Sequence, residues 1–237
     1  MRVTGGNMDG AALAAAMVAR EWLMFASVIF LLFGAEDLIV DALALAGVGG
    51  RVRPLSAMAQ TTAPVRFALF VPAWQEQAVI GPMLDRVTAA WAGCNIPVYV
   101  GVYPNDPETR ASVDAAARRN PRIHIVETAE DGPTTKGDCL NHLWARLMQD
   151  RAAGTVAVDA IILHDAEDVV DPDEPAALAH GLRSADAAQV PVVPILGRQG
   201  WWIRRHYGDE FAESHGKELP VRAAIGDDIS LKVDGNS

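Results

Sequence analysis

The sequence has few cysteines and no block of basic residues. Cys94 and Cys139 are the two cysteines in 237 residues, which excludes a disulfide framework and a cysteine-rich zinc site and suits a reducing compartment. Acidic residues outnumber basic residues by 30 to 20, giving a formal charge of −10. Because phosphate-backbone binding needs clustered Lys and Arg, we expect no nucleic-acid partner.

The motifs of several common enzyme classes are also missing. Neither G-x-G-x-x-G nor G-x-x-x-x-G-K-[ST] occurs, which counts against dinucleotide enzymes and P-loop NTPases. The six histidines show no metal-ligand spacing, and no serine or cysteine has an identifiable base. Half of the residues are hydrophobic, too many for a disordered chain, and 237 residues allow one large domain or two small ones.

An apolar run without charge covers residues 22–35. As a helix it would reach only ~21 Å, short of the ~30 Å hydrocarbon core of a membrane. We favour a membrane anchor near residues 11–35. A cleaved signal peptide ending near residues 42–44 and a buried core helix are the alternatives. Acidic residues interrupt the pattern after residue 35, so residues 38–48 are predicted to form a second, amphipathic helix.

The charges that flank this run indicate its orientation. Arg51, Arg53 and Arg66 follow the run with no acidic residue among them, whereas the basic residues before it are accompanied by acids. Because loops rich in Lys and Arg stay on the cytoplasmic side, we expect a protein of the bacterial inner membrane whose C-terminal part is cytoplasmic.

Strand-like and helix-like segments alternate after residue 64. Strands are predicted over 65–71, 96–103, 122–126, 157–163 and 189–196, and helices over 77–91, 108–119, 136–151 and 174–185. This alternation predicts an α/β fold with a mostly parallel sheet flanked by helices. We therefore divide the chain into a hydrophobic helical segment (1–48), a linker (49–64) and an α/β domain (65–237).

Ligands of such sheets bind beyond the carboxyl ends of the strands, so the polar residues there are candidates. Glu76 begins the helix after the first strand, and Asn105 and Asp106 follow the second. Taken singly, these are ordinary capping and turn residues. Lys136 opens the helix after the third strand, where a positive charge opposes the helix dipole. An anionic ligand would explain this lysine, although a solvated surface lysine is the alternative.

Three carboxylates follow the apolar strand predicted over 157–163. In an extended segment Asp165 and Glu167 would point to the same side, with Asp168 next to them. Like charges held together favour a bound cation, and oxygen ligands suit Mg²⁺ or Mn²⁺. The alternative is a solvated acidic turn before the next helix.

Three segments together, VPAWQE (71–76), TTKGDCLN (134–141) and LHDAEDVVDP (163–172), resemble the family 2 glycosyltransferases of the GT-A (Rossmann-like) fold. The resemblance covers roughly residues 15–225 and extends to the membrane-bound, bacteriophage adsorption protein B-like branch. It implies a nucleotide-sugar site formed by Pro72, Ala73, Glu76, Asn105, Asp106, Lys136, Asn141 and Asp165. It also implies that Mg²⁺ or Mn²⁺ is held by Asp165, Glu167 and Asp168.

The implied chemistry is attack of an acceptor hydroxyl on the anomeric carbon of a UDP-linked sugar, with the metal stabilising the departing diphosphate. The family's later general-base and acceptor motifs are not found. Residues 201–205 come too early for the acceptor motif, and Asp227 and Asp228 are misplaced for a base. The chain thus resembles the nucleotide-binding half of a transferase, truncated or naturally short. We expect it to bind the donor with little or no transfer alone.

Three functions remain open from the sequence. The first is a membrane-associated glycosyltransferase of envelope or exopolysaccharide synthesis, with the lipid bilayer and an envelope or polysaccharide-export protein as partners. The second is a non-catalytic membrane docking or nucleotide-binding regulatory module, which the missing base supports. The third is a degraded gene product with no stable fold.

Overall fold

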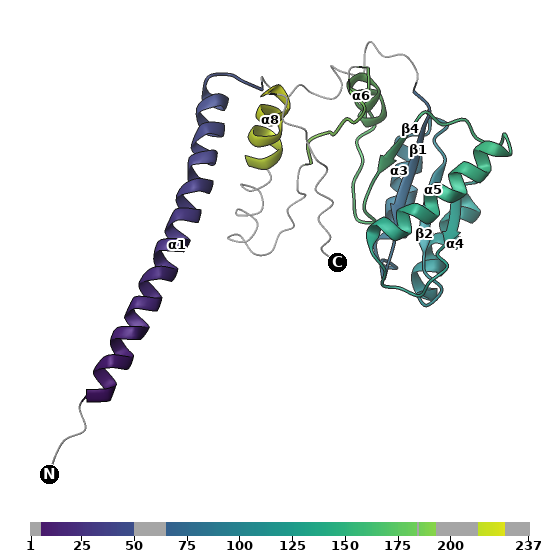
Figure 1. Ribbon diagram of the computed structural model, residues 1–237. Coiled ribbons are helices and arrows are strands. Elements are labelled where there is room, and N and C mark those ends of the chain that lie inside the picture. The colour runs from purple at the N-terminus through teal and green to yellow at the C-terminus, as the bar shows by residue number, and fades with distance from the viewer. Residues whose placement is uncertain (1–5, 50–64, 184, 193–212, 226–237) are drawn as a thin grey trace. The chain divides into compact units, whose positions relative to one another are not determined.

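The computed structural model describes residues 6–49, 65–183, 185–192 and 213–225 (Figure 1). Its contacts divide the chain into two compact units. One combines the N-terminal helix with residues 213–225, and the other contains residues 65–190. We describe each unit by itself.

The second unit is a parallel four-stranded sheet flanked by helices. Its strands are β1 (Phe67–Pro72), β2 (Val98–Val102), β3 (Ile123–Glu127) and β4 (Ala160–Leu163). Its helices are α3 (Ile80–Ala90), α4 (Pro107–Arg119), α5 (Lys136–Ala152) and α6 (Glu174–Gly181). The strand order is β3-β2-β1-β4, and every pair is parallel. The predicted α/β class and parallel sheet are therefore confirmed.

The side chains of β1 alternate between the two layers of the core, as the two-residue period of a strand requires. Phe67, Leu69 and Val71 pack with residues of α3 and α4, whereas Ala68 and Phe70 pack with residues of α5. Figure 1 shows α5 crossing one face of the sheet. The helices cover the two faces of the sheet. A ligand site can therefore form beyond the carboxyl ends of the strands, which we call the carboxyl edge of the sheet.

Two of the strand predictions need correction. The strand predicted over 157–163 as fully buried is β4, which is shorter and pairs only with β1 among the described residues. Its last residue, Leu163, is 51% exposed. The strand predicted over 189–196 is not formed in its described part, residues 189–192. Pro191 within it has no N–H for a ladder, and residues 193–196 lie outside the described residues.

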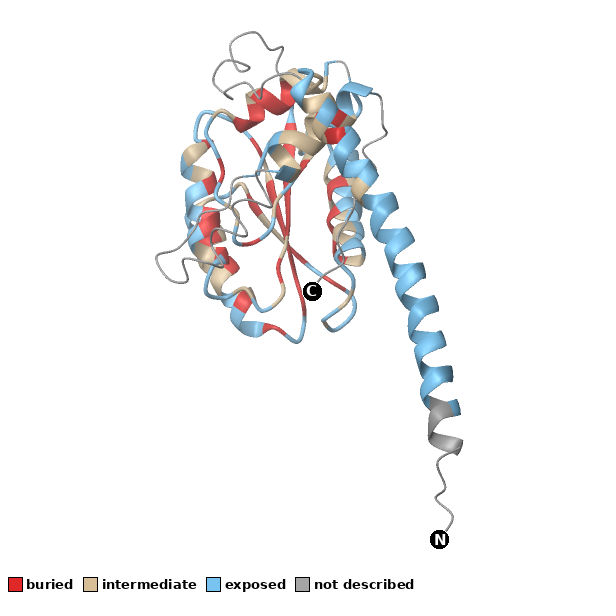
Figure 2. Ribbon diagram, turned by 90° about the vertical axis from the view of Figure 1, so that its left-hand side faces the viewer, coloured by how far each residue is buried: buried red, intermediate tan, exposed pale blue. Residues whose placement is uncertain are grey.

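The N-terminal segment forms one helix, α1 (Gly6–Leu45), rather than the two that we predicted. No proline or glycine stands between residues 35 and 38 to end the first helix, so the acidic residues continue it. Gly47 and Gly49 follow with positive φ values of 82° and 89°, a conformation that favours glycine and commonly ends helices. Figure 2 shows α1 exposed over most of its length, in contrast to the buried strands.

Residues Ala12–Leu45 of α1 are long and apolar enough to cross a membrane by length and composition. Only 6% of the most apolar stretch is buried, so the described contacts do not support the alternative of a buried core helix. A helix of 40 residues is ~60 Å long, about twice the thickness of the hydrocarbon core. Part of α1 must therefore lie outside that core if the helix crosses it.

The acidic residues near the end of α1 contact residues from the C-terminal part of the chain. Lys217 binds Asp41 with an Nζ–Oδ1 distance of 2.5 Å, and Arg222 forms an ion pair with Glu36. Both basic residues belong to two short helices, η2 (Ser214–Glu218) and α8 (Leu219–Ile225). The contacts of these two short helices group them with α1.

Candidate functional site

Hydrogen bonds to residues that follow β2 and begin α4 hold the loop that comes after β1. Gln75 has a φ of 58°, in the left-handed region that is uncommon for residues other than glycine. Its N–H donates to Asp106 Oδ2 at 2.6 Å, and the N–H of Glu76 donates to Thr109 Oγ1 at 2.9 Å. These two bonds fix the backbone that presents the Glu76 side chain at the carboxyl end of the sheet.

The Asp106 carboxylate accepts hydrogen bonds from two backbone segments, the loop after β1 and the start of α4. Besides accepting from Gln75, it is the N-cap of α4, because its Oδ1 accepts from the N–H of Thr109 at 3.2 Å. The residue is only 6% exposed. Each oxygen thus has a backbone donor, so the capping role inferred from its sequence context is present in the fold.

Asn105 links the β2 loop to the loop that precedes α5. Its Nδ2 donates to the carbonyl of Gly132 at 2.7 Å, and the N–H of Gly132 donates to its Oδ1 at 2.8 Å. A Cβ at Gly132 would lie 2.4 Å from the ring of Trp74. That ring packs edge-on against Tyr103, with centroids 5.1 Å apart. Gly132 therefore lets its loop approach these rings closely.

The carboxylates after β4 lie on a turn. Asp165 and Glu167 are exposed, and Ala166 between them is 2% exposed and belongs to the core. The N–H of Asp168 donates to the carbonyl of Asp165 at 3.2 Å and closes the turn. The two exposed carboxylates therefore lie on either side of the buried Ala166. The segment is a turn, so the prediction of an extended segment is wrong.

Carboxylates that follow β2 and β4 lie near enough to Glu76, which follows β1, to influence its charge. Partial burial raises the pKa of Glu76 above its ordinary value, and the negative charges of Glu167, Asp165 and Asp106 raise it further. Lys136, the first residue of α5, forms an ion pair with Asp165. The structure thus brings together predicted residues from the ends of β1, β2 and β4 with the start of α5. This excess of negative charge favours a bound cation.

Two members of this region, His164 and Glu174, were not among the predicted site residues. The ring nitrogens of His164 lie 2.9 Å from Asp168 Oδ2 and 2.9 Å from Glu174 Oε1. Burial alone would lower the pKa of His164, but the two carboxylates raise it to about 9. Burial would raise the pKa of Asp168, and the bonds from His164 and the Asp165 N–H outweigh it and lower that pKa. The short spacing of His164 and Asp168 in the sequence could have indicated their contact. Glu174 is ten residues from His164, so its contact had no such indication in the sequence.

Within the described ranges, no group of three or more His, Cys, Asp or Glu side chains is arranged to hold a metal ion. Asp168 Oδ2 already accepts from His164 and from the N–H of Asp165, so only its other oxygen could reach a metal. Asp165 and Glu167 remain as exposed oxygen donors. Mg²⁺ is commonly held by one or two carboxylates plus ligand phosphates, and such a partial set fits these residues.

The other predicted residues are placed as follows. Pro72 is the last residue of β1, and the N–H of the buried Ala73 donates to the carbonyl of Gly101 at 2.9 Å. Asn141 is exposed on α5. Asp227, Asp228 and residues 201–205 lie outside the described residues.

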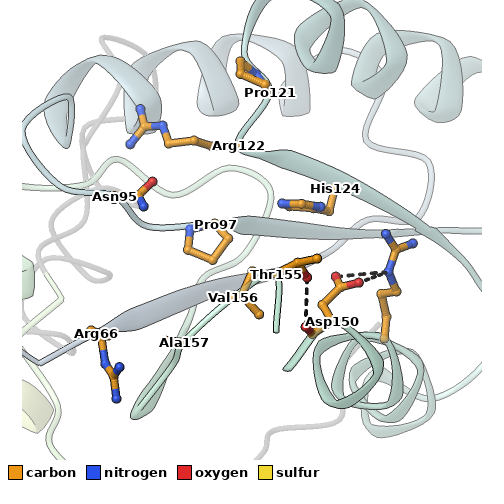
Figure 3. Close-up of a pocket in the computed structure, with 11 residues that line it drawn as sticks. Arg66, Asn95, Pro97, Pro121, Arg122, His124, Asp150, Thr155, Val156 and Ala157 are labelled. Carbon is orange, nitrogen blue, oxygen red and sulfur yellow. Dashed lines mark hydrogen bonds and ion pairs between the residues drawn. The ribbon is translucent and has the colours of Figure 1, made fainter. Parts of the chain in front are cut away.

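A pocket of about 640 Å³ lies at the opposite edge of the sheet, where the strands begin (Figure 3). Three arginines line it, and each has partners: Arg66 binds Asp159, Arg146 binds Asp150, and Arg122 donates to backbone carbonyls. The other lining residues are Asn95, Pro97, Pro121, His124, Asp150, Thr155, Val156 and Ala157. The predicted site residues lie at the carboxyl edge instead.

Comparisons with known proteins concern the second unit and the residues that follow it. Residues 64–232 match the family described as "Glycosyltransferase like family 2". The chain is 40% identical over 158 residues to "Bacteriophage adsorption protein B" of Escherichia coli K12 and, to the same extent, to "Bacteriophage N4 adsorption protein B" of Escherichia coli O157:H7. These matches cover 67% of this chain but 21% of each relative, so the chain spans about a fifth of their length.

Among solved structures, the mannosyltransferase PcManGT from Pyrobaculum calidifontis, in complex with GDP-Man and Mn²⁺, matches with a TM-score of 0.42 and 18% identity. That match covers 70% of this chain and 44% of the mannosyltransferase.

Proposed function

Because the chain belongs to the glycosyltransferase-like family 2, we propose that its second unit binds a nucleotide-diphosphate sugar at the carboxyl ends of β1, β2 and β4. The observation that carries this proposal is the ion pair between Lys136 and Asp165, with Glu167 on the same turn as Asp165 and Glu76 within the electrostatic influence of both carboxylates. Three separate segments of sequence supply these groups, and the charges suit a diphosphate with its metal ion.

The residues after β4 and at the start of α5 would bind the diphosphate. Asp165 and Glu167 offer exposed oxygens for Mg²⁺ or Mn²⁺, with Asp168 contributing at most its second oxygen. The metal would supply positive charge to the departing diphosphate. Lys136 binds Asp165 in the structure and lies where its ammonium group could also contact a phosphate.

The residues after β1 and β2 would bind the nucleoside. Pro72, Ala73 and Glu76 would form one wall of the nucleoside site. There the Glu76 carboxylate would be available to bind the ribose or the base. Asn105 and Asp106 hold the neighbouring loops through their side-chain bonds, so we assign them a positioning role beside the nucleoside. Asn141, exposed on α5, would contact the sugar nucleotide.

Sugar transfer needs a general base that receives the proton of the acceptor hydroxyl. We assign none of the described residues to that role. Donor binding, with little transfer by this chain alone, is therefore the activity that we propose.

We also propose that α1 anchors the protein in the bacterial inner membrane, where it would serve envelope or exopolysaccharide synthesis. The exposed apolar surface of α1 supports this. The basic residues after α1 predict that the α/β unit is cytoplasmic. Alkaline phosphatase fused after Arg66 should be inactive, and strong phosphatase activity would contradict this orientation.

The donor site is tested by calorimetric titration of the full chain in detergent with UDP and with GDP, each with Mn²⁺ or with EDTA. We expect Mn²⁺-dependent binding that is lost in Asp165→Asn and weakened in Glu167→Gln. Asp114→Asn, a half-buried residue of α4 that pairs with Arg110, is the matched control and should bind like the wild type. A folded wild-type chain that binds neither nucleotide would contradict the proposed function.

A further inference from the structure

His164 stands between the end of β4 and the carboxylate turn. Its backbone N–H donates to the carbonyl of Phe70 at 3.1 Å, so it is tied to the end of β1. Its side chain is 13% exposed, and the side chain of its partner Glu174 is 6% exposed. A histidine held this firmly at the start of a ligand loop can determine where the loop lies.

The first contact of the ring leads directly into the turn. Asp168 Oδ2 lies 2.9 Å from His164 Nδ1, and the same oxygen accepts from the backbone N–H of Asp165 at 2.9 Å. The imidazole therefore orients the Asp168 carboxylate, which in turn holds the backbone of Asp165. The turn bond from the Asp168 N–H to the Asp165 carbonyl completes this closed arrangement.

The second contact of the ring leads to the helical layer. His164 Nε2 lies 2.9 Å from Oε1 of Glu174, the first residue of α6. Trp91, the C-cap residue of α3, lies beside the imidazole, with ring centroids 6.2 Å apart, and its indole N–H donates to the carbonyl of Asp171 at 3.0 Å. His164 thus connects the turn to packed elements on one side of the sheet.

The geometry points to His164 as a positioning residue for the metal and diphosphate site: through Asp168 it holds the turn that presents Asp165 and Glu167. This inference rests on the proposed function. Both ring nitrogens are occupied by carboxylates, so His164 acts through Asp168 and does not touch the ligand.

Two conservative variants of the full chain separate the two contacts. The amide nitrogen of Asn can occupy the place of Nδ1, and that of Gln the place of Nε2. His164→Asn should therefore keep the bond to Asp168 and lose the bond to Glu174, and His164→Gln should do the reverse. His180→Asn and His180→Gln are matched controls, because His180 contacts Arg183 and lies outside the turn.

Two measurements on these variants decide the inference. The first is amide hydrogen exchange of Asp165 without ligand, and the second is the affinity for UDP and GDP with Mn²⁺ and with EDTA. We expect His164→Gln to speed Asp165 exchange at least tenfold and to weaken Mn²⁺-dependent binding about tenfold, with little change in EDTA. His164→Asn should stay within about threefold of the wild type in both, as should the His180 controls.

The contradicting results are distinct. If His164→Gln folds and leaves both measurements unchanged, or if Asn and Gln reduce binding equally with Mn²⁺ and with EDTA, the positioning role is wrong. If the wild-type chain binds neither nucleotide, the proposed function fails and the inference about its site falls with it. A wild type that binds normally, together with an unaffected His164→Gln variant, would overturn the inference alone.

Discussion

Lys136 and Asp165 form an ion pair between the first residue of α5 and the turn after β4, although 29 positions separate them in the sequence. The pair joins two motifs that the sequence presents as unrelated segments. It also explains a positive charge at a helix N-terminus, where the macrodipole disfavours one. Both side chains are substantially exposed, so the contact contributes little to stability and its effect should appear in ligand binding.

The first prediction concerns Lys136→Met. An exposed ion pair is worth ~0–1 kcal/mol, so the free energy of unfolding should change by less than about 1 kcal/mol in urea titrations. Mn²⁺-dependent nucleotide binding should weaken about tenfold, because an ammonium group near the phosphates is lost. Arg86→Met, on α3, is the control and should leave binding unchanged. A Lys136→Met variant with wild-type affinity would remove this lysine from the site.

The second prediction concerns Gly132→Ala. A Cβ at this position would lie 2.4 Å from the Trp74 ring and 2.9 Å from Tyr103. The rings or the loop must shift, so we expect a loss of about 1–3 kcal/mol in the free energy of unfolding, the usual range for overpacking. Gly137→Ala in α5 is the control, because the nearest atom to its Cβ is 3.9 Å away. Equal stability of the two variants would show that the loop does not close on these rings.

The third prediction concerns Asp106→Ala. Loss of the N-cap of α4 costs ~1 kcal/mol, and the Gln75 N–H loses its acceptor as well. The free energy of unfolding should therefore fall by about 2 kcal/mol in chemical denaturation. Asp106→Asn keeps one acceptor oxygen and should fall by about half as much. Asp114→Ala, farther along α4, should change it by less than about 0.5 kcal/mol. If Asp106→Ala behaves like Asp114→Ala, the two backbone bonds are not formed.

The fourth prediction concerns the two thiols. Cys139 is fully buried, and this burial raises its pKa to about 11, whereas Cys94 is exposed. Because the thiolate is the reactive form, a thiol reagent at pH 8 should label Cys94 rapidly and Cys139 only on unfolding. A Cys94→Ser variant that reacts rapidly under native conditions would contradict the packing of α5 on β2.

Much of the second unit follows from patterns in the sequence. The helix at 108–119 was predicted from its composition, with the Asp before Pro107 as its cap, and the strand ends gave the candidate residues. That β4 pairs only with β1 among the described residues could not be predicted, because an apolar segment does not show which strands flank it. The contact between His164 and Glu174 could not be predicted either, since it depends on how α6 packs against the end of β4. Nor did the acids of α1 show that the helix continues through them.

The central claim is that the carboxyl edge of the sheet binds a metal-nucleotide complex. The most direct measurement is paramagnetic broadening of amide signals from the full, isotopically labelled chain in detergent, with Mn²⁺ added in the presence of UDP or GDP. We predict that the amides of residues 74–76 and 165–168 broaden first, while those of His124 and Thr155 at the opposite edge stay sharp. Broadening that begins around His124 and Thr155 and spares residues 165–168 would contradict the claim.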